Sequence, residues 1–519
     1  MKKISTFIVI VVITCNLFAG GLVTNTNQSA MFTRLQNRNA STGIDAVYFN
    51  PAGVTKLGNG FFVSINNQTV SQTKTVVTDY PSLNGKPREY VGDVSAPIYP
   101  GIYAAYNAGN FSFSAGFNPI GGGGGAKYKT GLPSFEMPIS AIPPTLTSSG
   151  IPTSKYSADI FFEGTSVYFG YQFNVAYKLN EQISVGAGLR VVSAKNTYKG
   201  SIQNIQINPN QPAFGADFNG SNMVFAKDFF NAGNNVYSQF SDGLTALGLP
   251  AATPLTSLPA QTQGQISALL GLTPEVLAAM NVGQAIGGLN SVAQTMANNA
   301  AATQDTYADV EETGTGYAPI LSVNYSPSDK FNFSLKYEFK TNLELKTTVF
   351  DNKGAGIFVS GEKVIADMPA MLAIGAEIKP IEKLSVAVTF NTYFDKNVNY
   401  SGRDKSGAET IKRNYIEYGL GVEYSFTDKL RASAGWLGTN TGILPAYQTD
   451  QRFSSNSNSF GLGAGYRISP LIDINIGGQY TINAKYDKIY YTAMSGYTET
   501  YSKETLIFAI GLDFYFGKK

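Results

Sequence analysis

The sequence predicts an all-β protein, a 14-stranded antiparallel transmembrane β-barrel. Three observations lead to this prediction. Large apolar residues alternate with small or polar ones over long segments, the predicted connections alternate between short and long, and the composition suits contact with lipid. Of the 519 residues, 14% are charged, against roughly 25% in a soluble domain. Gly (54), Tyr (31) and Phe (33) are abundant.

The alternation is clearest near the C-terminus. Between Leu506 and Phe516 every even position is large and apolar, whereas the odd positions are mostly smaller or polar. The segments 331–340, 384–391 and 415–426 repeat this pattern. Successive side chains of a strand point to opposite faces, so each segment predicts a strand with one apolar face. A secreted β-sandwich is the alternative that this pattern leaves open.

Short links such as Ala108-Gly109-Asn110 and Thr427-Asp428-Lys429 join these segments in pairs, as hairpin turns do. Six short turns on one side and seven long loops on the other, with an even number of long strands, are typical of an outer-membrane barrel. The predicted strands lie near 60–73, 99–107, 110–120, 166–179, 182–199, 314–327, 330–346, 367–379, 382–395, 413–426, 429–438, 457–469, 471–485 and 503–516.

The composition excludes several classes of function. The chain has no His and one Cys, Cys15, so His-dependent catalysis, a His/Cys zinc site and a disulfide are excluded. The net charge of +2 gives no reason to expect a nucleic-acid partner. The sequence predicts no enzyme, no catalytic residue, no metal and no cofactor. A Ser-Lys hydrolase is the one enzyme class that remains formally open.

Residues 1–20 predict a secretory signal peptide, because a basic start is followed by a short apolar run and small residues. Thr14 and the apolar Leu17-Phe18 around Cys15 disfavour a lipidation site. Residues 21–58 are not strand-like. Their last part contains Asn50-Pro51-Ala52-Gly53, which predicts a tight turn, and the simplest interpretation of 21–58 is a periplasmic arm.

Several motifs together resemble a known family. They are the run from Tyr48 to Leu57 followed by a Gly-rich strand start, Gly116-Phe117-Asn118-Pro119-Ile120-Gly121, and the run from Asn174 to Arg190 across one predicted turn. With the count of fourteen strands, they make the whole mature chain similar to the FadL-like long-chain fatty acid transporters, a family that includes aromatic hydrocarbon channels.

The resemblance implies that residues 21–58 form a hatch plugging a barrel of residues 59–519, with Asn50, Pro51, Ala52 and Gly53 as its turn in the lumen. It also implies that the third strand kinks inward and opens the wall. Pro119 cannot donate to a ladder and the following glycines make a poor strand, which fits such a break. The start of a flexible outer loop fits them equally well. The predicted kink residues are Pro119, Gly121, Gly122 and Gly123.

Two long outer loops are predicted, at 121–165 and 200–313. The second contains two or three short amphipathic helices, one of them starting at Thr273-Pro274. The resemblance implies that the two loops form a hydrophobic groove that captures ligand. The predicted ligand-binding residues are Leu269, Leu270, Leu277 and Met280. Helix packing alone is the competing interpretation of these residues.

In the lumen, Arg34, Arg38 and Arg190 are candidates to hold a carboxylate. The alternative is an ordinary polar lumen whose charges pair across the barrel, with inward residues such as Lys336, Glu338 and Asp473.

The sequence therefore predicts a monomeric channel in the outer membrane of a Gram-negative cell. It would take up hydrophobic compounds, most of all long-chain fatty acids, by passive diffusion, a hatch change and lateral exit. Its partners would be the hydrophobic ligand, outer-membrane lipid and the barrel assembly machinery, although the chain ends Phe516-Gly517-Lys518-Lys519 rather than on an aromatic residue. A general porin and a surface adhesin are the alternatives, the latter because of the 200–313 loop.

Overall fold

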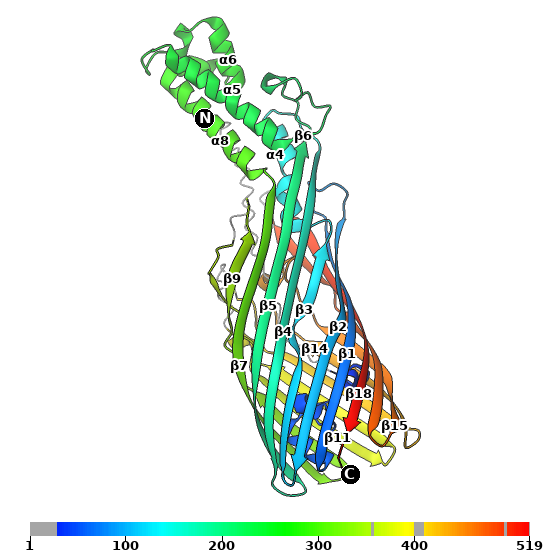
Figure 1. The fold of residues 1–519 in the computed structure, drawn as a ribbon. Helices are drawn as coiled ribbons and strands as arrows, with labels where there is room; N and C mark the ends of the chain where they lie inside the picture. The colour runs from blue at the N-terminus through cyan, green and yellow to red at the C-terminus, as the bar shows by residue number, and fades with distance from the viewer. Residues whose placement is uncertain (1–28, 354–357, 399–408, 492–495, 518–519) are drawn as a thin grey trace.

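The computed structural model describes residues 29–353, 358–398, 409–491 and 496–517. The predicted signal peptide therefore lies outside the described residues. One antiparallel sheet of 18 strands dominates the fold, and 14 of its strands close into a barrel, as predicted (Figure 1). The barrel strands are β1 (Gly60–Thr78), β2 (Arg88–Ala108), β3 (Phe111–Tyr128), β4 (Tyr156–Lys178), β5 (Ile183–Ile207), β7 (Thr306–Ser328), β8 (Phe331–Glu338), β11 (Met371–Ile381), β12 (Leu384–Tyr393), β13 (Tyr415–Ser425), β14 (Leu430–Asn440), β15 (Ser457–Ser469), β16 (Ile472–Asn483) and β18 (Gly496–Tyr515).

The first and last strands complete the ring. β1 pairs with β18 over their whole common length, from Phe62 opposite Tyr515 to Thr78 opposite Glu499. Short turns join the strands at the end of the barrel that carries the Phe62–Tyr515 pair, which we call the turn end. The opposite end, which carries the Thr78–Glu499 pair, has the long connections, and we call it the loop end. Four short strands add to the sheet toward the loop end: β6 (Val224–Phe225), β9 (Glu344–Asp351), β10 (Lys363–Ile365) and β17 (Tyr486–Tyr491).

The strands of the first half extend farther toward the loop end than the sequence predicts. β5 and β7 pair as far as Ile202 opposite Thr306, within residues that the sequence assigned to an outer loop. On the outer face of this extension, Glu311 and Asp309 pair with Lys195 and Lys199, which lie within the predicted strand 182–199. Such a strand is hard to recognise in the sequence, because its outer face carries charged residues and resembles a solvated loop.

The predicted strand 330–346 is instead two strands, β8 and β9. Between them Asp367 accepts hydrogen bonds from the Leu343 N–H at 2.9 Å and the Lys340 ammonium at 3.0 Å. These bonds hold the chain away from a continuous ladder, and a bridge from Thr341 to Met368 continues the wall at this point.

A belt of exposed apolar side chains surrounds the half of the barrel nearest the turn end. Leu506, Phe508, Ile510 and Leu512 are exposed on β18, whereas Ile507 and Ala509 between them are buried. An apolar belt with aromatic residues at its edge is the pattern of a barrel in a bilayer. Among the described helices, none has both the length and the hydropathy of a membrane span. Exposed aromatic residues at the turn end include Phe61, Phe111, Tyr177, Tyr325, Phe331, Phe426 and Phe516.

Helices occupy the lumen and the loop end. Figure 1 shows that α5, α6 and α8 project as an arm beyond the loop end, opposite the C-terminus. Within the arm, α5 and α8 pack through fully buried Phe229, Phe230 and Leu289. The helices are α1 (Ala30–Arg34), α2 (Ala46–Phe49), α3 (Pro133–Ser140), α4 (Ile142–Ser148), α5 (Ala226–Ala246), α6 (Ala260–Leu270), α7 (Pro274–Ala279) and α8 (Val282–Ala302), with 3-10 turns η1 (Pro51–Leu57), η2 (Pro212–Phe214), η3 (Leu255–Ser257), η4 (Asp395–Asn397) and η5 (Pro445–Tyr447).

Local sequence explains where the arm helices begin. Thr273 caps α7, as predicted, by accepting a hydrogen bond from the Val276 N–H. Asn281 and Gln284 form a capping box at the start of α8, in which each side chain accepts from the other residue's N–H. Both caps satisfy N–H groups that a helix start leaves without partners.

The belt makes a direct prediction about stability. Phe508→Arg places a charge on the lipid-facing side, so the free energy of unfolding should fall by about 2–4 kcal/mol. Urea titration of the barrel in lipid vesicles measures this change. Lys199→Arg, outside the belt, is the control and should change little. Equal stability of the two variants would contradict the assignment of the belt.

Candidate functional site

The part of the N-terminal segment that the structure describes before β1 lies inside the barrel. We call residues 29–57 the inner segment. Its α1 contacts β14, β15, β16 and β18 on one side of the lumen, and η1 contacts β2 to β5 and β7 on the other. Ala30, Ala46, Val47 and Ala52 have no exposed surface. The inner segment therefore crosses the lumen near the belt (Figure 1).

The turn predicted at Asn50-Pro51-Ala52-Gly53 lies against the wall. The Asn50 amide donates to the Ser41 carbonyl at 3.0 Å and to the Asn324 amide oxygen at 2.7 Å. Its own oxygen accepts from the Gly53 N–H at 3.3 Å. Asn50 is fully buried, so its side chain both closes the turn and fastens it to β7.

Two serines of the barrel wall hold Ala52. The Ala52 N–H donates to the Ser322 hydroxyl at 3.0 Å, and the Ser184 hydroxyl donates to the Ala52 carbonyl at 2.7 Å. Pro51 occupies the first position of η1, where a missing N–H costs nothing. A Cβ on Gly186 would lie 3.2 Å from the Ala52 nitrogen, so a glycine in β5 permits this close approach.

Tyr48 anchors the inner segment to a buried charge cluster. Arg190 and Lys336 each lie 4.8 Å from the centre of the Tyr48 ring. Both also pair with Glu338, Arg190 at 2.6 Å and Lys336 at 2.7 Å. The Lys336 ammonium donates to the Tyr48 carbonyl at 2.9 Å. Cation–π contacts and ion pairs strengthen when they are removed from water, as here.

The three arginines considered for a carboxylate site all have acidic partners. Arg34 pairs with Glu423, Arg38 with Asp45 through two hydrogen bonds of 2.7 and 2.8 Å, and Arg190 with Glu338. This arrangement is the alternative raised from the sequence, in which lumen charges pair with one another. A carboxylate on any of these guanidinium groups must displace an internal partner.

The wall changes at the predicted kink. β3 does not end at the glycines but continues to Tyr128, so the glycine run belongs to the wall and is not the start of a loop. β2 and β3 pair at Asp93–Lys127 and again only at Ile102–Phe117. Among these described residues, no ladder pair joins 94–101 of β2 to 118–126 of β3. We call this stretch the wall interval.

The glycines hold β3 on its other neighbour. Pro119, Gly121 and Gly124 stay paired with β4, with two register shifts that leave surplus residues on β3. Gly122 has a φ of +86°, and a Cβ there would lie 2.1 Å from the Ser166 carbonyl oxygen. Only glycine fits this conformation and contact. β3 therefore bends against β4 and separates from β2.

Beside the wall interval, β2 also departs from its regular ladder with β1. Its chain bulges at Pro97 and Ile98, between the pairs Gln68–Tyr99 and Val70–Ala96. The Asn67 amide donates to the Pro97 carbonyl at 3.2 Å, and its oxygen accepts from the Tyr99 N–H at 3.0 Å. Ile98 is 76% exposed. Asn67 of β1 thus satisfies the bulge in the β1–β2 ladder, and the exposed Ile98 gives this part of the wall interval an apolar side chain.

Helices α3 and α4 cover the loop end beside this interval. Ile139, Ile142 and Leu146 are fully buried. Glu136 accepts from the hydroxyls of Tyr90 at 2.8 Å and Tyr156 at 2.9 Å. These contacts tie α3 to β2 and β4, so the helix pair forms a fixed apolar layer over the mouth.

A second contact fastens α3 to the loop before β15. The Asp450 carboxylate accepts from the Ser134 N–H at 2.7 Å, near the start of α3. Burial raises the pKa of Asp450, and the hydrogen bond from the Ser134 N–H opposes that shift in part. The layer of α3 and α4 is therefore fastened to β2 and β4 and also to the loop before β15.

The four residues predicted to bind ligand lie elsewhere. Leu269 and Leu270 are on α6, Leu277 is on α7 and Met280 follows it, and all four pack against the apolar core of the arm. Leu270 is 8% exposed. In this conformation they stabilise the arm, and their contact with a ligand stays a prediction.

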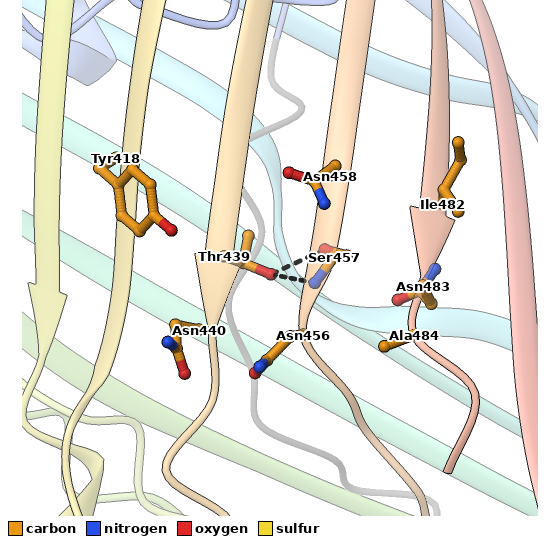
Figure 2. A pocket seen from close by; sticks show the side chains of 9 residues that line it. All are labelled: Tyr418, Thr439, Asn440, Asn456, Ser457, Asn458, Ile482, Asn483 and Ala484. Carbon is orange, nitrogen blue, oxygen red and sulfur yellow. Dashed lines mark hydrogen bonds between the residues drawn. The ribbon is translucent and has the colours of Figure 1, made fainter.

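Two surface pockets differ in character. One, of about 320 Å³, is lined mainly by Asn and small polar residues at the loop ends of β14 to β16, where Thr439 and Ser457 bond to each other (Figure 2). Its polar lining does not suit an apolar ligand. The other, of about 650 Å³, is an apolar groove on the outer face with Phe61, Tyr106, Phe113 and Phe173 around Ala104 and Ala115.

Several contact residues have no signal in the sequence. Ser184, Ser322 and Asn324 bind the turn of the inner segment across more than 130 positions of chain. Each is a small polar residue on an inward strand face, like many others. Only the closed barrel brings them to Asn50 and Ala52.

This geometry has counterparts among solved structures, although the sequence has no match among family profiles or curated proteins. The structure is similar to that of a FadL homologue from Pseudomonas aeruginosa, with a TM-score of 0.59 over 96% of this chain and 100% of that one, at 12% identity. The chain has the FadL fold. The P. putida toluene transporter TodX is also similar, with a TM-score of 0.51, 12% identity and coverage of 92% and 95%.

The turn contacts make a second prediction. Asn50→Ala removes three hydrogen bonds, each worth roughly 1 kcal/mol, so amide exchange across 46–57 should quicken at least tenfold. Hydrogen-exchange mass spectrometry of the folded barrel measures this rate. Asn458→Ala, which removes an amide bonded to Trp436 on the outer face, is the control. Unchanged exchange in Asn50→Ala would show that the turn is held by other contacts.

Proposed function

We propose that this protein is an outer-membrane channel for the passive uptake of hydrophobic compounds, with long-chain fatty acids as the first substrates to test. The observation that carries the proposal is the wall interval between β2 and β3, beside a lumen that the inner segment crosses. Because the inner segment obstructs the lumen in this proposal, an opening in the wall would give a ligand a lateral path out of the barrel. The FadL fold and the apolar belt support the same function.

Energetics favour the lateral route for an apolar molecule. Each CH₂ group that leaves water for hydrocarbon gains about 0.8 kcal/mol. The lumen around the inner segment is instead rich in ion pairs, such as Arg431 and Arg467 with Asp473. A tail that passed straight through would lose this gain, so we propose entry through the loop end and exit through the wall interval.

In this proposal the inner segment is a hatch. Its hydrogen bonds to Ser184, Ser322 and Asn324 and the contact of Tyr48 with Arg190 and Lys336 hold the resting position. A small shift of this segment would widen the path to the wall interval without emptying the barrel. No catalytic step or energy source is part of the proposal.

We further propose that the channel acts as a monomer in the outer membrane of a Gram-negative cell, inserted by the barrel assembly machinery. A closed barrel satisfies its backbone without a second copy. The pairing of β1 with β18 completes that closure within one chain.

The arm supports a second candidate function, surface adhesion. α5 and α8 each have 21 residues and stand clear of the barrel (Figure 1). Replacing residues 226–302 with a short Gly-Ser linker separates the two roles. Retained uptake with lost cell attachment would assign adhesion to the arm, whereas lost uptake would assign the arm to capture.

The wall interval makes a third prediction. Deleting Gly122 and Gly123 removes the surplus residues of β3, so the strand can straighten and pair with β2. Uptake of labelled oleate by cells that otherwise lack this protein should fall at least fivefold at equal surface amounts. Deleting the exposed Gly248 and Leu249 after α5 is the matched control. Equal uptake by wild type and the Gly122–Gly123 deletion would contradict lateral exit.

A further inference from the structure

Two lysines face each other inside the barrel toward the loop end. Lys74 on β1 lies directly opposite Lys503 on β18 in the register. Their neighbours on the same strand faces, Gln72, Val76 and Tyr501, are buried, which places both lysine side chains on the inward face. Like charges directly opposite each other in a sheet are destabilising.

These lysines differ from the other cations of the lumen. Arg34, Arg38, Arg190, Lys336, Arg431 and Arg467 all have a carboxylate partner. Within the described residues, neither Lys74 nor Lys503 has an ion-pair or hydrogen-bond partner for its ammonium group. Both lysines are half-buried. An ammonium group withdrawn from water is costly unless it is paired, so this position favours an anion that the protein itself does not provide.

The acidic residue nearest along the same face is already engaged. Glu499 lies four residues from Lys503 on β18, which is about 13 Å along a strand. Tyr501 stands between them and donates its hydroxyl to Glu499 at 2.5 Å. Glu499 is therefore placed to serve Tyr501 and not the lysine pair.

The surroundings of the pair suit an apolar tail. Lys74 is opposite Gly92, and the Tyr128 ring occupies the space beside Gly92, only 2.4 Å from where a Cβ would lie. Val76, Val94 and Tyr128 are buried parts of the apolar cluster that continues into α3 and α4. The pairs Gly92–Tyr128 and Asp93–Lys127 form the loop-end boundary of the wall interval. The two charges thus lie beside apolar surface next to the proposed exit.

We propose that Lys74 and Lys503 bind the anionic head group, carboxylate or phosphate, of an apolar-tailed ligand, with the tail directed over the apolar cluster toward the wall interval. This inference rests on the proposed function and adds to it a preference for anionic amphiphiles. Two ammonium groups donate charge-assisted hydrogen bonds to the oxygens of one head group. Binding relieves the repulsion between them, so the bare pair is a site prepared for an anion.

Three probes with the same C18 tail test this proposal: oleate, oleyl phosphate and oleyl alcohol. Binding of each probe, in radiolabelled form, to the full-length protein in non-ionic detergent is measured directly by equilibrium dialysis. Lys74→Gln/Lys503→Gln should weaken oleate and oleyl phosphate at least tenfold and leave oleyl alcohol unchanged. Lys74→Arg/Lys503→Arg keeps both charges and should retain anion binding. Lys195→Gln, on the outer face with Glu311, is the matched control.

The outcomes separate this inference from the proposed function. Binding of all three probes that is unaffected by the Gln variant would overturn the lysine site and leave the hydrophobic channel in place. Equal weakening of oleyl alcohol would also overturn it, since the loss would then concern the tail or the fold. Absence of binding of every probe to the wild type would overturn both. Loss of oleate alone or of oleyl phosphate alone would assign the site to that head group.

Discussion

The structure depends on one constraint: in an apolar medium, every backbone N–H and C=O of a sheet needs a partner within the protein. The pairing of β1 with β18 satisfies this constraint by closing the ring. Departures from the ladder are therefore costly and need a local substitute. The bulge of β2 at Pro97 and Ile98 is such a departure, and Asn67 of β1 provides the substitute by bonding to Pro97 and Tyr99.

Closure also determines what the interior can hold. The inward faces carry charges and amides that would be exposed to water in an empty barrel. Here they contact the inner segment, and ion pairs such as Arg34 with Glu423 join it to strands that lie far away in the chain. The inner segment contains little regular structure, since α1 has five residues and α2 has four. Its position comes from the wall, which explains why Ser322 and Asn324 matter as much as its own turn.

Much of the barrel followed from the sequence because the signal is local. Period 2 predicted the fourteen strands, and tight links such as Thr427-Asp428-Lys429 located the turns within a few residues. The loop-end extensions of β5 and β7 were missed, since Asp309 and Glu311 on an outer face resemble a solvated loop. The arginine candidates illustrate a second limit. Arg34, Arg38 and Arg190 drew attention as charges, but only the fold shows that each has an acidic partner.

The sequence by itself determined the fold class, the strand order and the turn at Asn50 to Gly53, because alternation, turn chemistry and Pro–Gly preferences act over a few neighbouring residues. The tertiary structure decided which charges are paired, where the wall opens and that Lys74 meets Lys503. These properties depend on register between strands that are separated in the chain, by 34 residues at Asp93–Lys127 and by 429 at Lys74–Lys503. A shift of one residue in that register would turn each side chain to the other face.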